Sequence, residues 1–175
     1  MRTVKFASKL LICLLFLAFT NPDKDSTYYT INSLFKIERS KDNNQILYDV
    51  NLDKSGHINR KNPINIYWIR NTEGGKIKPL TWIQQKFAYG LHFINVNKEY
   101  ANFKFVSYNK MMFTLKRIKN NQFEVYTKHN NKLLKINRIF IQINGGSFWV
   151  PNITAVEIYA RNMKTGKNVI ETITP

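Results

Sequence analysis

The sequence predicts an all-β protein, either an antiparallel β-sandwich or a partly open β-barrel, of about ten strands with one short helix. Apolar and polar residues alternate with a period of two along most of the chain, in segments rich in β-branched and aromatic residues. Short polar turns separate these segments. One segment, residues 79–89, has helical spacing instead. The periodicity does not choose between sandwich and barrel.

The first three strands are expected at residues 34–39, 45–52 and 64–70. The polar run 41–44 supplies the turn between the first two. In the third strand, Ile64, Ile66 and Trp68 would share one face, and Tyr67 would lie on the other.

The segment 79–89 (PLTWIQQKFAY) is expected to form the helix. Thr81 is a suitable N-cap, and Gly90 lies where a helix would end. The spacing places on one helix face the apolar residues Trp82, Ile83, Phe87 and Ala88. We expect this helix to cover an open end or an edge of the sheet.

The remaining strands are expected at residues 91–97, 102–108, 112–118, 122–128, 135–143, 154–160 and 168–173. The first four of these are separated by short polar turns, which predicts an antiparallel meander.

The N-terminal residues 1–20 have the layout of a secretory signal peptide. A basic start is followed by an apolar run at 10–19 (LLICLLFLAF), which is too short to span a bilayer. We therefore expect residues 21–33 to be an N-terminal linker, residues 34–175 to be a single β-domain, and the protein to be exported to the periplasm or the extracellular space. Cleavage would also remove Cys13, the one cysteine, so no disulfide or thiol nucleophile would remain.

The charge of the chain is strongly positive. Lysine and arginine number 27 against 11 acidic residues, a net charge of +16, and loss of the signal peptide with Arg2, Lys5 and Lys9 would leave +13. Such a charge favours anionic partners. For an exported protein these are anionic lipids or acidic glycans rather than nucleic acid. Compositional drift is the alternative, because lysines are spread along the chain among abundant asparagine and isoleucine.

Aromatic and cationic residues gather around the third strand and the helix, as in sites that bind a glycan or an anionic amphiphile. In this hypothesis the charge would be met by Arg70, Lys86 and His92. The apolar wall would be formed by Tyr67, Trp68, Trp82 and Tyr89. The alternative is that both tryptophans are core residues and that the lysine and arginine are solvated. This hypothesis makes the protein a non-catalytic binding domain of the cell envelope.

Two further function classes stay open. A hydrolase would need a pair of carboxylates or a histidine beside a carboxylate in a cleft. A structural adaptor would bind an envelope protein through an exposed sheet edge. No cofactor or metal site is expected, because the three histidines, His57, His92 and His129, lack the spacing of metal ligands.

Three blocks of the sequence, residues 64–70 (INIYWIR), 79–90 (PLTWIQQKFAYG) and 156–173 (VEIYARNMKTGKNVIETI), occur in an order and spacing that resemble a known family. This is the exported bacterial family called domain of unknown function 4833. The resemblance covers roughly residues 34–173. It implies a single secreted or periplasmic all-β domain, and it brings no activity, ligand or catalytic residue.

Overall fold

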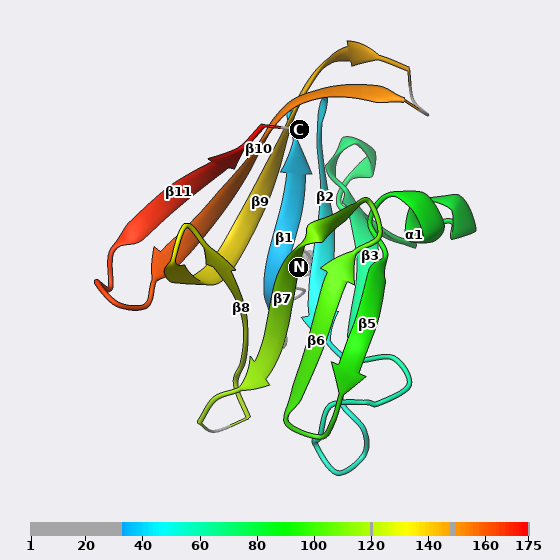
Figure 1. Cartoon of the computed structure of the whole chain (residues 1–175). Helices are drawn as coiled ribbons and strands as arrows, with labels where there is room; N and C mark the ends of the chain where they lie inside the picture. Colours follow the sequence, from blue (N-terminus) through cyan, green and yellow to red (C-terminus); the bar gives the residue numbers. More distant parts are fainter. Residues whose placement is uncertain (1–32, 120, 148–149, 175) are drawn as a thin grey trace, which may run out of the picture.

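The computed structural model describes residues 33–119, 121–147 and 150–174. The predicted signal peptide and nearly all of the predicted linker lie outside these residues. In the described part, eleven strands form one curled mixed sheet, an open half-barrel, with a single short α-helix (Figure 1). The all-β class with one short helix is therefore confirmed. None of the helices in this part is long and apolar enough to cross a membrane.

The elements follow one another as β1 (Ser33–Arg39), β2 (Asp42–Val50), β3 (Ile64–Arg70), β4 (Lys76–Pro79), α1 (Trp82–Phe87), β5 (Leu91–Val96), β6 (Tyr100–Phe105), β7 (Tyr108–Arg117), β8 (Phe123–His129), β9 (Lys132–Gly146), β10 (Pro151–Asn162) and β11 (Asn168–Ile173). A single 3-10 turn, Asn71–Glu73, separates β3 from β4.

Strand β9 organises the sheet, because both layers of the half-barrel are hydrogen-bonded to it. Its first residues pair with β8, and its middle residues pair with β1. One layer therefore runs β1-β2-β3-β4 and the other runs β8-β7-β6-β5. Strand β10 pairs with the other edge of β9, and β11 pairs with β10. All pairs are antiparallel except β1 with β9, which is parallel.

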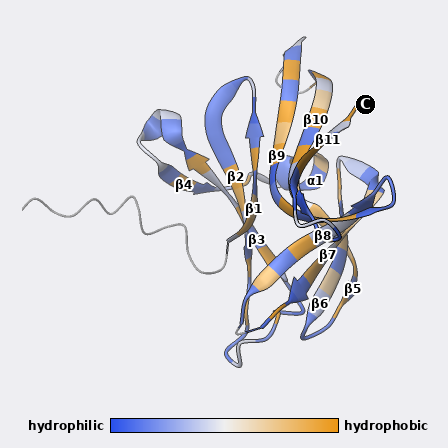
Figure 2. Ribbon diagram, turned by 90° about the vertical axis from the view of Figure 1, so that its left-hand side faces the viewer, coloured by the Kyte–Doolittle hydropathy of each residue, from blue (hydrophilic) through white to orange (hydrophobic). Residues whose placement is uncertain are grey.

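The core lies between the two layers, where the alternation of each strand places its apolar side chains (Figure 2). Its centre is aromatic. Phe35 of β1 stacks on Tyr48 of β2 with ring centroids 4.4 Å apart, and Phe105 of β6 meets both rings edge-on. The stack continues through Phe103 and Phe113, whose centroids are 5.6 Å apart. Burial of each such ring stabilises the fold by roughly 2–3 kcal/mol, so this cluster holds the two layers together.

Helix α1 lies between β4 and β5 in the chain, and these are the end strands of the two layers, so α1 closes the side where the layers are not paired. The predicted cap is confirmed: Thr81 and Gln84 form a reciprocal capping box. Gly90 ends the segment, because a Cβ at this position would lie 1.8 Å from the Gln85 carbonyl oxygen. The helix, Trp82–Phe87, is shorter than expected. Pro79 belongs to β4, a strand of four residues that is too short to show an alternation in the sequence.

Candidate functional site

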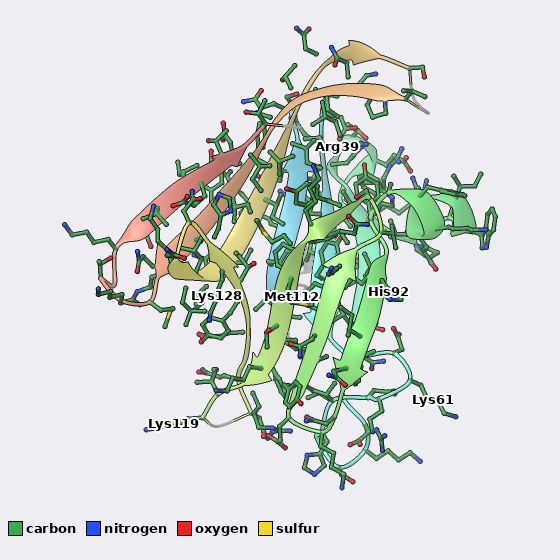
Figure 3. All side chains as sticks on the ribbon, in the orientation of Figure 1. Arg39, Lys61, His92, Met112, Lys119 and Lys128 are labelled. Atoms are coloured by element: carbon green, nitrogen blue, oxygen red, sulfur yellow. The ribbon has the colours of Figure 1, made fainter. Side chains whose placement is uncertain are left out.

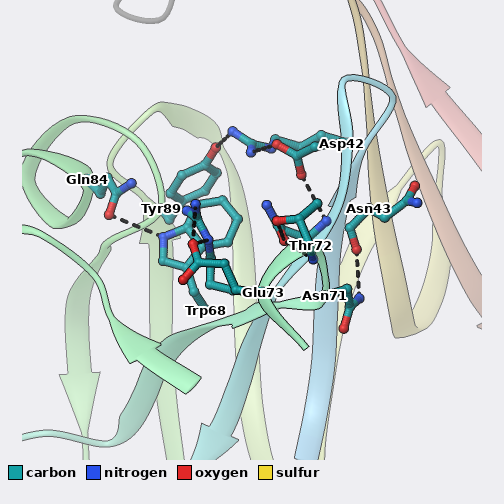
Figure 4. A network of polar contacts seen from close by, with 11 residues as sticks. Asp42, Asn43, Trp68, Asn71, Thr72, Glu73, Gln84 and Tyr89 are labelled. Atoms are coloured by element: carbon teal, nitrogen blue, oxygen red, sulfur yellow. Dashed lines mark hydrogen bonds and ion pairs between the residues drawn. The ribbon is translucent and has the colours of Figure 1, made fainter. Parts of the chain in front are cut away.

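Two of the predicted site residues, Trp68 and Tyr89, meet beneath α1 (Figure 4). Trp68 is only 3% exposed, and its indole Nε1 donates a hydrogen bond of 3.2 Å to Gln84 of the helix. The ring of Tyr89 meets it edge-on at 5.5 Å. Arg39 lies 4.8 Å above the Trp68 ring and donates to the Tyr89 hydroxyl over 2.9 Å. These contacts attach the helix to the sheet and leave the Trp68 ring buried.

Arg70 lies 5.9 Å from the Trp68 ring, at the edge of this cluster. Its guanidinium binds the carboxylate of Glu73 at 2.9 Å, and the same carboxylate binds Lys78 at 2.5 Å. The charge of Arg70 is thus already matched by a neighbour in the chain.

Tyr67 lies on the opposite face of β3, as its place in the alternation predicts. Its hydroxyl donates a hydrogen bond of 2.5 Å to Asp49 of β2. Burial raises the pKa of Asp49, and the hydrogen bond from Tyr67 only partly offsets this. Burial and the same hydrogen bond raise the pKa of the Tyr67 phenol. Tyr67 therefore belongs to a separate polar pair and does not share a site with Trp68.

Trp82 and Lys86 lie on the outer surface of α1. Trp82 is 66% exposed, so the alternative that both tryptophans are core residues holds only for Trp68. The Lys86 ammonium lies 4.7 Å from the Trp82 ring and 5.4 Å from that of Phe87. His92 is exposed on β5, opposite Lys104 of β6 (Figure 3). The seven predicted residues thus occupy several separate places and not one cavity.

A basic face, which the sequence reasoning did not identify, covers the outward side of the second layer. We use this name for the outward lysines of β6 to β9, which are Lys104, Lys110, Lys116, Lys128 and Lys135. Only Lys135 has a carboxylate partner among the described residues, Glu124 at 2.7 Å. The period of two was the available signal, since it places Lys110 and Lys116 on one side of β7. The cross-strand neighbours of β7 were not predictable from the sequence.

A groove of about 610 Å³ lies on the basic face, over β7, β8 and the end of β10. Three of its lining side chains are exposed and apolar: Met112 at 41%, Leu133 at 43% and Met163 at 42%. Met163 closes one side, because its backbone N–H donates to the Leu133 carbonyl over 2.9 Å. The lining also includes Tyr108, Lys110, Lys116, Tyr126 and Lys128; Met112 and Lys128 are labelled in Figure 3.

A second hollow of about 490 Å³ adjoins the groove and shares Thr114 and Lys116 with it. None of the seven predicted site residues lines either hollow.

Glu124 is the carboxylate that forms an ion pair with the basic face, through Lys135. Burial opposes its ionisation, but the hydrogen bonds from Lys135 and Tyr126 outweigh burial and lower its pKa. Glu124 is therefore ionised at neutral pH, and Lys135 neutralises it. Lys110, Lys116 and Lys128 form no ion pair with a carboxylate of the described residues, although Glu124 lies across from Lys116 in the pairing of β7 with β8.

Every aspartate and glutamate within the described ranges has a bonding partner. Six carboxylates form ion pairs, and the partners of the other three are the Tyr67 hydroxyl, the backbone amides after Asp53, and Tyr159 with Gln142. Two histidines approach a carboxylate, His57 to Glu99 at 3.3 Å and His129 to Glu171 at 3.9 Å. Each of these carboxylates also forms an ion pair, Glu99 with Arg117 and Glu171 with Lys132. Neither histidine has a carboxylate to itself, and a hydrolase function stays a prediction. The same part of the chain has no group of three potential metal ligands.

Three strands, β4, β5 and β11, have a hydrogen-bonded neighbour on one side only within the described structure. These edges are where an adaptor would bind a partner strand, and that function also stays a prediction.

Comparison with known proteins identifies the family of the chain. No curated protein and no solved structure matches it. The family model described as domain of unknown function 4833 matches residues 35–172, a range that includes α1, the basic face and the groove. The chain therefore belongs to the family of domain of unknown function 4833.

Proposed function

We propose that this domain binds an anionic amphiphile, without catalysing a reaction, in the groove over β7 and β8. The observation that carries the proposal is the composition of the groove, where three lysines without a carboxylate partner in the described structure surround exposed methionine and leucine side chains. The binding expected from the sequence, of an anionic amphiphile or glycan, is thus proposed for the groove residues instead of the residues around β3 and α1.

The charge distribution supports an anionic headgroup as the ligand. On the outward side of β1, Glu38 accepts from Lys36 at 2.7 Å and from Arg138 of β9 at 3.0 Å. On the basic face, Lys110, Lys116 and Lys128 have no such partner in the described structure. Unpaired ammonium groups around one hollow attract a phosphate, sulfate or carboxylate.

The apolar lining supports a hydrocarbon chain more than a sugar. Met112, Met163 and Leu133 offer flexible, non-planar apolar surface, which adapts to an acyl chain. Sugars are bound mainly by flat aromatic faces. Of the two tyrosines in the groove, Tyr126 is held by a hydrogen bond to Glu124. We therefore favour an amphiphile over a glycan.

Export is part of the same proposal. An amphiphile-binding domain in the periplasm or outside the cell would meet envelope lipids, and the N-terminal sequence predicts this location. N-terminal sequencing of the protein from fractionated cells tests it, with cleavage near residue 21 as the expected result.

The test of binding uses dodecyl phosphate below its micellar concentration, titrated calorimetrically into the protein. We expect the triple variant Lys110→Gln/Lys116→Gln/Lys128→Gln to bind at least about tenfold more weakly. The matched control, Lys54→Gln/Lys61→Gln/Lys167→Gln, removes the same charge from exposed lysines outside the groove and should bind like the wild type.

Two results would contradict the proposal. Equal weakening in both triple variants would mean that net charge alone attracts the ligand. Equal affinity for inorganic phosphate and for dodecyl phosphate would mean that the apolar lining contributes nothing.

A further inference from the structure

We infer that helix α1 is a docking element for an anionic bilayer surface. In this arrangement Trp82, Ile83 and Phe87 enter the interface of the bilayer, and Lys86 meets the headgroups. The element lies apart from the groove on β7 and β8, so the inference stands independently of the proposed function.

The exposure of the helix is the first argument. Trp82 is 66% exposed, Phe87 61% and Ile83 40%, and α1 has no buried residue at all. An ordinary surface helix buries its apolar side against the core. Here the core is covered instead by flanking residues, since Leu80 is buried and Tyr89 packs against the core. The side chains of Trp82 and Phe87 thus lie mostly outside the core.

The rigid attachment of the helix is the second argument. Besides the capping box, Gln85 donates to the Leu80 carbonyl over 3.2 Å, and Gln84 accepts from Trp68. The far end is held by Ser107, whose hydroxyl donates to the Ala88 carbonyl over 2.7 Å. A six-residue helix is unstable alone, so these bonds hold the exposed aromatic rings in a fixed arrangement. Such preorganisation lowers the entropy lost on binding.

The chemistry of the exposed side chains identifies the occupant. Tryptophan, phenylalanine and lysine side chains anchor proteins at the level of lipid headgroups, because the rings are apolar and the ammonium meets the phosphates. Lys86 has no carboxylate partner among the described residues and lies over both rings, so insertion of the rings would bring its ammonium to the phosphates. The chain as a whole carries +16, which an anionic bilayer attracts.

The shape of this region favours a bilayer over a folded partner. Figure 1 shows α1 projecting from the side of the sheet beyond β3 and β5. A projecting apolar element needs a matching hollow in a rigid partner, whereas a bilayer interface deforms around it. A protein partner is therefore the competing outcome in the test.

The experiment measures co-sedimentation of the wild-type protein with vesicles of phosphatidylglycerol and phosphatidylcholine, compared with pure phosphatidylcholine vesicles. The wild type should bind the anionic vesicles. Trp82→Ala/Phe87→Ala should bind them about tenfold or more weakly, because two large apolar surfaces are lost. The matched control, Ile94→Ala/Ile170→Ala, removes two exposed apolar side chains from β5 and β11 and should bind like the wild type. Both variants should keep the wild-type circular dichroism spectrum, since none of the four residues is buried.

Several results would overturn the inference: no binding of the wild type to anionic vesicles, or equal binding by the wild type and Trp82→Ala/Phe87→Ala. Loss of a dimer in light scattering, without change in vesicle binding, would assign α1 to contact with a second copy. Dodecyl phosphate binding distinguishes the two proposals: if Trp82→Ala/Phe87→Ala loses vesicle binding but binds dodecyl phosphate like the wild type, the helix and the groove act separately.

Discussion

Glu171 is the most buried of the ion-paired carboxylates in the described residues, and it joins distant parts of the sheet. Its side chain is 8% exposed and accepts from Lys132 at 2.6 Å and from Asn130 at 3.2 Å. These partners belong to the start of β9 and the β8–β9 turn, where Asn130 and Asn131 have positive φ as in a tight hairpin. The hydrogen bond from Lys132 lowers the pKa of Glu171 despite its burial.

This lowered pKa predicts a dependence of stability on pH. Since the folded pKa lies below the ordinary value of 4.5, the stabilisation is fully present above pH 4.5 and is lost as the pH falls through the folded pKa. Glu171→Gln should therefore lower the free energy of unfolding by about 1–2 kcal/mol at pH 7. Urea unfolding of both proteins should show this difference shrinking below pH 4.5. A difference that stays constant down to pH 2 would contradict it. Glu73→Gln, at an exposed ion pair, is the control and should change little.

Gly90 follows α1 at a position where the chain passes too close to the Gln85 backbone for any side chain. A Cβ at Gly90 would collide with the Gln85 carbonyl oxygen and carbon, both backbone atoms that cannot move aside cheaply. The same residue accepts a backbone hydrogen bond from Val106, so it ties the helix to the β6–β7 turn. The orientation of α1 depends on this contact.

Gly90→Ala is accordingly expected to be severe, lowering the free energy of unfolding by about 3 kcal/mol or more. Gly74→Ala is the comparison: it has positive φ but open space around its Cβ, so its cost should be about 1 kcal/mol. Urea denaturation measures both. Equal losses would show that the collision at Gly90 is relieved by a backbone shift.

The N-cap of α1 gives a second prediction for the helix. The Thr81 hydroxyl oxygen accepts from the Gln84 backbone N–H, and the Gln84 side-chain oxygen accepts from the Thr81 backbone N–H. Thr81→Ala should cost about 1 kcal/mol, and Thr81→Ser should restore most of it. Thermal unfolding followed by circular dichroism measures the three proteins. A Thr81→Ser protein no more stable than Thr81→Ala would show that the side-chain oxygen is not what stabilises the helix.

Local signals were enough to predict most elements of the molecule. The alternation predicted β3, and Thr81 marked the start of the helix correctly, whereas the helix ends at Phe87, before Gly90. Contacts between distant segments were not predictable: β1 pairs in parallel with β9, and Glu38 binds a residue 100 positions away. The same limit explains the candidate site. Of the seven predicted residues, the fold brings Trp68, Tyr89 and Arg70 together but places Tyr67 and His92 elsewhere. The groove depends on the pairing of β7 with β8, which brings Lys110 and Lys128 to one hollow and which local patterns do not predict.

The lysines of the basic face, which carry like charges on one side of the sheet, have a cost for the stability of the whole molecule. Like charges repel within the folded protein, and salt screens this repulsion. The free energy of unfolding should therefore rise with ionic strength between about 0.02 and 0.5 M. At low salt Lys110→Gln/Lys116→Gln/Lys128→Gln should be more stable than the wild type by about 0.5–1 kcal/mol. Denaturation at several salt concentrations tests both statements. A triple variant less stable than the wild type would show that the lysines support the fold instead.

The sharing of β9 by both layers also determines when the domain can form. The first layer contains β1 to β4, yet its strand β1 needs β9, which lies almost a whole domain later in the chain. A chain synthesised only as far as β8 has neither layer closed at this seam. The polypeptide therefore cannot reach its final structure until β9 has been made. Pairing of segments so far apart in the chain is also slow, so we expect this domain to complete its folding only after its synthesis has passed β9.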